Sequence, residues 1–92
     1  MFGKINLVNF DGITSMPQEV ASAWHDAVED YVGVNYKPLL YLGWQLVNGV
    51  NYYFIAEQII LSNPQVRRIV ALTIHADDND IELIDDSIQE IL

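Results

Sequence analysis

The chain has 92 residues, 13 of them acidic and four basic, and its formal net charge is −9. This length predicts one domain with one core, and the hydrophobic content of 51% excludes a disordered protein. The negative charge argues against a nucleic-acid-binding protein and against binding to an anionic membrane, since both need a surface rich in lysine and arginine. The chain has no cysteine, which excludes disulfides, thiol nucleophiles and zinc–thiolate sites.

The apolar segments are too short to predict a membrane-spanning helix, which needs about 18 or more consecutive apolar residues. Near the start, Asn6, Asn9 and Asp11 interrupt any hydrophobic region that a signal peptide would need. We therefore expect neither a transmembrane segment nor a signal peptide in this chain. The location stays open between the cytoplasm and export after removal of a signal.

The first predicted element is a short strand over Lys4 to Phe10, ended by Asp11-Gly12. A helix is predicted next. Its start has Ser15 as the N-cap, Pro17 in the first turn and Gln18 at the capping-box position.

The helix has a continuous apolar stripe, with Gly33 as the stop signal. The stripe consists of Val20, Ala23, Trp24, Ala27, Val28, Tyr31 and Val32. A single helix with one apolar face must pack against strands, because nothing else in the chain is left to cover it.

Two strands are predicted on either side of Asn48-Gly49, over Tyr36 to Val47 and Tyr52 to Leu61. A two-residue type I′ turn needs φ > 0 at both central residues, which Asn and Gly reach most easily. This turn places Trp44 opposite Tyr53 and Leu42 opposite Ile55, with Leu40, Leu42, Trp44 and Leu46 on one face. Gly43 in mid-strand marks a bend or a bulge.

A fourth strand is predicted over Val66 to Ala76, between turns at Ser62–Gln65 and Asp77–Asp80, with Val66, Val70, Leu72 and Ile74 on one face. Residues 81–92 alternate at first and then fit a helix, so a strand is favoured and a helical end is left open. The predicted fold is α+β: a single domain over residues 1–92, in which one long helix is gripped by a curled antiparallel sheet of four to five strands.

No catalytic site is predicted, and the chain is interpreted as a non-enzyme without cofactor or metal. His25 and His75 are read as surface histidines, since no nucleophile is paired with either in the sequence. Asp78, Asp80 and Glu82 alternate as in a calcium loop, but the glycine and distal glutamate of such a loop are missing, so a solvated acidic rim is favoured. Trp24 and Trp44 are expected to pack in the core.

The string Gln45-x-Val47-x-Gly49, followed by Asn51-Tyr52-Tyr53, resembles the Gln-x-Val-x-Gly signature of the cystatins. In that family the pentapeptide forms the first inhibitory hairpin, and residues like Asn-Tyr-Tyr commonly follow it. The order of a strand, a long helix and an antiparallel meander is also the cystatin order, so the resemblance covers the whole chain.

The resemblance implies a reversible, tight-binding inhibitor of papain-like cysteine proteases. Its wedge would consist of an N-terminal trunk, with Gly12 or alternatively Gly3 as the trunk glycine, and the first hairpin. The implied protease-binding residues are Gln45, Leu46, Val47, Asn48, Gly49 and Gly12. The chain departs from the family at the second hairpin, where Asp77–Asp80 replaces the Pro-Trp pair often found there, which weakens the implied docking.

The alternative is a non-inhibitory cystatin-fold module that binds or scaffolds another protein. Exposure of Val47 and Val50 at the level of the trunk would favour the inhibitor, and burial would favour the module. A monomer is expected, and a dimer that swaps the third-strand hairpin would lose the first hairpin and the inhibition.

Overall fold

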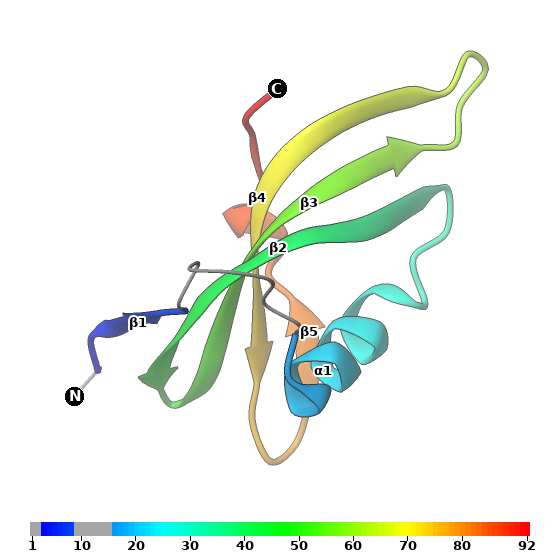
Figure 1. Cartoon of the computed structure of the whole chain (residues 1–92). Coiled ribbons are helices and arrows are strands. Elements are labelled where there is room, and N and C mark those ends of the chain that lie inside the picture. Colours follow the sequence, from blue (N-terminus) through cyan, green and yellow to red (C-terminus); the bar gives the residue numbers. More distant parts are fainter. Residues whose placement is uncertain (1–2, 9–15) are drawn as a thin grey trace.

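The computed structural model describes residues 3–8 and 16–92, and it shows one helix packed against a curved antiparallel sheet (Figure 1). The elements are β1 (Ile5–Leu7), α1 (Gln18–Val28), β2 (Val34–Val47), β3 (Gly49–Ile60), β4 (Val66–Ala76), β5 (Ile81–Leu83), a 3₁₀ turn η1 (Asp85–Ser87) and β6 (Gln89–Glu90). The strand order is β1-β2-β3-β4-β5, and β6 also pairs with β4. The predicted α+β class is confirmed. The sheet has more strands than expected because the last twelve residues contribute two short ones.

The start of α1 differs from the prediction. Pro17 is the N-cap residue, with φ −57° and ψ 150°, and Gln18 is the first helical residue rather than the capping-box residue. The extended ψ of Pro17 aims its carbonyl at the helix, where it accepts the N–H groups of Val20 at 3.0 Å and Ala21 at 2.9 Å. The predicted N-cap, Ser15, lies outside the described residues.

The end of α1 also comes earlier than predicted, at Val28 instead of near Gly33. The chain must reverse to enter β2 at Val34, and Gly33 takes φ +83° in this connection. Tyr31 still packs against the core, but Val32 is 95% exposed. The apolar stripe therefore predicted a helix one turn too long.

The core lies between α1 and the middle of β3 and β4. Its centre is Phe54, which is fully buried and packs edge to face with the Trp24 ring at a centroid distance of 4.8 Å. The other buried residues of the cluster around Phe54 are Val20, Ala27, Ala56, Val70, Leu72, Ile74 and Leu83. Trp24 thus packs in the core as predicted. Trp44 does not, because it is 37% exposed near the end of β2.

The pairing of β2 with β3 is irregular. Its register shifts between Pro38 and Leu40 and again between Tyr41 and Gly43, which confirms an irregularity at Gly43. Because of the second shift, Tyr41 rather than Leu42 packs against Phe54, at a centroid distance of 5.5 Å. The prediction that alternate residues from Leu40 to Leu46 share one face is therefore wrong.

The predicted register at the β2–β3 hairpin is wrong by one residue near the turn and by two residues beyond Gly43. Trp44 pairs with Tyr52 rather than Tyr53, and Ile55 pairs with Leu40 rather than Leu42. The first residue of this error comes from the turn, in which Val47 pairs with Gly49 and leaves only Asn48 between the strands. The second comes from the shift between Tyr41 and Gly43.

The β3–β4 pairing is regular, with an unbroken register from Val50↔Ala76 to Ile60↔Val66. The limits of β4 and the face shared by Val70, Leu72 and Ile74 agree with the prediction. Val66 lies on the same alternation at the strand end and is 44% exposed. The turns at residues 62–65 and 77–80 are also confirmed. The last segment is a short strand, a 3₁₀ turn and a second short strand.

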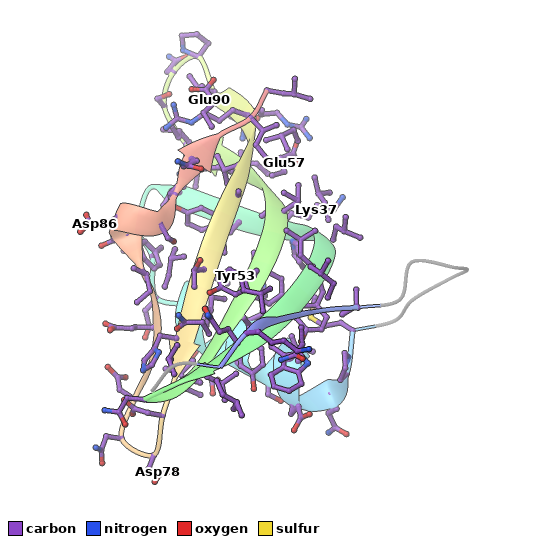
Figure 2. The ribbon with its side chains drawn as sticks, turned by 90° about the vertical axis from the view of Figure 1, so that its left-hand side faces the viewer. Lys37, Tyr53, Glu57, Asp78, Asp86 and Glu90 are labelled. Atoms are coloured by element: carbon purple, nitrogen blue, oxygen red, sulfur yellow. The ribbon has the colours of Figure 1, made fainter. Side chains whose placement is uncertain are left out.

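Among the described residues, the strand that pairs with the outer edge of β2 is β1, and its partners are limited to Gly43, Trp44 and Gln45. The first half of β2 contains Lys37 and Pro38, both exposed (Figure 2 labels Lys37). Among residues 3–8 and 16–92, no helix is long and apolar enough to cross a membrane.

Candidate functional site

The β2–β3 hairpin carries five of the six residues implied to bind a protease. Gly49 takes φ +101°, and among the described residues only glycines have positive φ, so Asn48 does not. The predicted type I′ turn, which needs two positive φ values, is therefore wrong. A turn with a single left-handed residue at its last position needs only one glycine, and Gly49 supplies it.

Gly49 is also required by the close approach of β4. A Cβ at this position would lie 2.5 Å from the Ala76 carbonyl oxygen and 3.0 Å from Asp77 Cβ. Such distances force the backbone to move, so only glycine fits between the hairpin and the end of β4. The glycine of the motif thus has a structural role in this chain, whatever the hairpin binds.

Gln45 connects the hairpin to the N-terminal segment. Its Nε2 donates to the Gly3 carbonyl at 2.7 Å, and its Oε1 accepts from the Tyr53 hydroxyl at 2.6 Å. Gly3 N–H in turn donates to the Leu46 carbonyl at 2.7 Å. The segment at Gly3 therefore lies beside the hairpin. Gly12, the other candidate for the trunk glycine, lies outside the described residues.

The β4–β5 turn lies on the other side of the hairpin, with Asp78 at its tip (Figures 1 and 2). The Asp77 carboxylate accepts the N–H groups of Asn79 at 2.8 Å and Asp80 at 2.9 Å. These two backbone hydrogen bonds, and then the neighbouring His75, lower the pKa of Asp77 below its ordinary value of 3.8.

His75 lies between the two turns and is less exposed than expected for a surface histidine. Its Nδ1 is 2.8 Å from Asn51 Oδ1, and its Nε2 is 3.5 Å from an Asp77 carboxylate oxygen. A shallow hollow of about 520 Å³ is lined by Asn51, His75 and Asp77 and by the hairpin residues Gln45, Val47 and Asn48. His25, in contrast, is exposed on α1, and its Nε2 lies 2.7 Å from a carboxylate oxygen of Glu29.

We call the combined surface of Gly3, Gln45–Val50 and Asp77–Asp80 the tip surface. It consists of three chain segments at one end of the sheet. Its most exposed large apolar side chain is Leu46, which is 53% exposed, whereas Val47 and Val50 are half-buried. The turn beside this apolar hairpin carries three carboxylates, at positions 77, 78 and 80.

The sequence did not predict the hydrogen bond between Tyr53 and Gln45 or the contact between His75 and Asn51. Gln45 and Tyr53 come together only in the observed register, where Gln45 pairs with Asn51 and Gly43 pairs with Tyr53. In the part of the chain that the structure describes, no cluster of three or more His, Asp or Glu side chains is arranged to hold a metal ion.

Comparison of the chain with models of known protein families, with curated proteins and with solved structures finds no match.

Proposed function

We propose that this protein is a reversible inhibitor of papain-like cysteine proteases that acts as the cystatins do, by inserting the tip surface into the cleft of the enzyme. The observation that carries the proposal is the 2.7 Å hydrogen bond from Gly3 N–H to the Leu46 carbonyl. This bond places an N-terminal segment beside a hairpin with the sequence Gln45-x-Val47-x-Gly49.

Inhibition of this kind needs shape and apolar contact but no chemistry from the inhibitor. Leu46 would supply exposed apolar area, with Val47 and Val50 beside it. The Gln45 side chain and the close fit of Gly49 against β4 hold these segments before any enzyme is bound. Because little ordering is then left for the docking step, the entropic cost of binding is small.

The acidic β4–β5 turn sets the charge of the target. Asp77, Asp78 and Asp80 would lie against the rim of the enzyme cleft beside the hairpin. Carboxylates at a rim act mainly on the association rate and on partner choice. We therefore expect a protease with a basic rim at this place to be inhibited faster than one with an acidic rim.

The second candidate is a non-inhibitory module that binds a different protein through the same fold. It is favoured by the structural roles of Gln45 and Gly49, which explain two of the three motif residues without any partner. Full exposure of Val47 and Val50 would favour the inhibitor and full burial would favour the module. Both side chains are half-buried, so they do not decide between the two candidates.

The deciding experiment is titration of papain and of a cathepsin-L-type enzyme with monomeric protein, comparing the wild type with Leu46→Asp. Gly49 is unsuitable for this test, because any side chain there collides with the Ala76 carbonyl. We expect inhibition at nanomolar to low micromolar concentration, weakened about thirtyfold or more in the variant, as for a residue at an interface centre.

The matched control is Leu61→Asp, since Leu61 is 50% exposed just beyond β3 at the opposite end of the sheet. This variant should inhibit as well as the wild type. If the native monomer leaves both enzymes fully active at high micromolar concentration, the inhibitor proposal is wrong and the second candidate stands.

A further inference from the structure

A second pocket, of about 370 Å³, lies between the first turn of α1 and the hairpin end of the sheet. It faces the helix side of the sheet, whereas the hydrogen bonds of Gln45 lie on the other side. Its walls include three aromatic side chains, Tyr41, Trp44 and Tyr52, and one carboxylate, Glu19. Its volume is within the range of about 300–1,000 Å³ typical of small-molecule sites.

The three aromatic rings come together because of the irregular β2–β3 register. Trp44 pairs directly with Tyr52 across the strands, and the shift before Gly43 turns Tyr41 to the same face. The rings of Tyr41 and Tyr52 are 6.4 Å apart at an angle of 63°, so they form two walls rather than a stack. Trp44, at 37% exposure, leaves part of its indole accessible to a ligand.

Of the described residues that line the pocket, Glu19 alone is charged. Burial raises the pKa of the Tyr41 and Tyr52 hydroxyls, and the nearby Glu19 carboxylate raises both further. The basic side chains of the chain are engaged or placed elsewhere. Arg67 lies 2.8 Å from Glu57, Arg68 hydrogen-bonds to Gln58, and neither Lys4 nor Lys37 lines the pocket.

This combination selects for an alkylated cation. The negative faces of Trp and Tyr rings attract a positive charge, and a nearby carboxylate adds to that attraction. A quaternary ammonium group has apolar methyl groups that fit aromatic walls and no N–H groups that would need hydrogen-bond acceptors. The net charge of −9 also raises the local concentration of cations.

We propose that the pocket formed by Tyr41, Trp44, Tyr52 and Glu19 is a binding site for a small ligand with a quaternary ammonium group. Two residues of the tip surface, Leu46 and Val50, also line this pocket. The proposed ligand is held by the three aromatic rings and Glu19, none of which belongs to the tip surface, and it needs no protein partner. Either can fail while the other holds.

The test is a titration of the protein with choline chloride, followed by the indole N–H signals of its two tryptophans in NMR spectra. Sodium chloride at equal concentration controls for ionic strength. We expect the Trp44 signal to shift with saturation, while Trp24, which is buried against Phe54, serves as the internal reference and stays fixed.

One neutral ligand and three protein variants identify the interaction. The neutral analogue of choline, in which a tert-butyl group replaces the trimethylammonium group, should bind about tenfold more weakly. Glu19→Gln should weaken choline binding severalfold, whereas Tyr52→Phe, which keeps the ring, should preserve it. Glu82→Gln, a change of the same kind on β5, should have no effect.

Three results would overturn the proposal. The first is a Trp44 signal that does not move up to high millimolar choline. The second is equal affinity for choline and its neutral analogue, which would indicate a purely apolar pocket. The third is unchanged binding in both Glu19→Gln and Trp44→Leu, with the spectra showing intact folds, which would place the ligand elsewhere.

Discussion

The two ladders that share β3 differ in regularity. Between β3 and β4 the register runs without a break, and the pairs Phe54↔Leu72 and Ala56↔Val70 belong to the buried core. Between β3 and β2 the register shifts twice, and the ladder ends at a glycine that touches β4. The regular ladder therefore supplies most of the burial, while the irregular one determines the shape of the tip surface and of the aromatic pocket.

The largest expected effect comes from breaking the regular ladder at Phe54. Phe54→Ala should lower the free energy of unfolding by about 3–5 kcal/mol, because it empties the fully buried centre of the core. Ile55→Ala, on the opposite face of the same strand and only partly buried, should cost less than about 2 kcal/mol. Urea denaturation of both variants measures the difference, and equal losses would show that the core is not on the helix side.

A smaller effect is expected at Gly43 in the irregular ladder. A Cβ there would lie 2.1 Å from the Asn6 carbonyl oxygen, so Gly43→Ala should push β1 away from β2 at a cost of about 1–3 kcal/mol. Hydrogen exchange should then accelerate at the Gly3 and Val8 amides, which donate to β2.

The matched control for Gly43 is Gly33→Ala. Gly33 also has positive φ, but a Cβ there meets nothing within 4 Å, so this variant should lose about 1 kcal/mol without faster exchange in β1. Similar exchange rates in the two variants would show that backbone strain, rather than collision with β1, dominates at Gly43.

The smallest effect concerns the turn at the end of the regular ladder. The pKa of Asp77 is lowered in the folded protein, so its ionised form contributes stability above its ordinary value of 3.8, and this contribution is lost as pH falls through the folded pKa. Asp77→Asn should therefore be less stable than the wild type at neutral pH and lose less stability on acidification.

Thermal unfolding from pH 6 down to pH 2 measures this dependence. Asp78→Asn removes a carboxylate of the same turn that makes no hydrogen bond among the described residues, so it should leave the acid dependence close to that of the wild type. An unchanged slope in Asp77→Asn would mean that the turn is not held by its carboxylate.

The sequence predicted the regular part of the molecule better than the irregular part. The limits of β4 and its buried face follow from strict alternation, which a regular ladder preserves. The order of elements and the α+β class also follow from periodicity. The end of α1 could not be predicted in this way, since Val32 continues the apolar stripe but is exposed where the chain turns back.

The geometry of the candidate site depended on features that periodicity does not contain. The turn has one residue fewer than predicted, so every cross-strand partner along the hairpin differs from the predicted one. The register shift near Gly43 places Tyr41, instead of the predicted Leu42, against the core. The pair Gln45–Tyr53 and the group Tyr41–Trp44–Tyr52 both result from these two irregularities. The hairpin itself was predicted correctly because Asn48-Gly49 interrupts two apolar runs.

The part of the β2 edge that no described residue pairs with has a consequence for the protein at high concentration. A long strand with a free row of backbone donors and acceptors can recruit a strand from another molecule, and repeated recruitment leads to fibrils. Pro38 interrupts that row because it has no N–H to donate, and the ammonium group of Lys37 beside it repels its counterpart on a second copy. Two neighbouring residues at the outer edge thus protect a sheet that is otherwise rich in apolar side chains from polymerising along that edge.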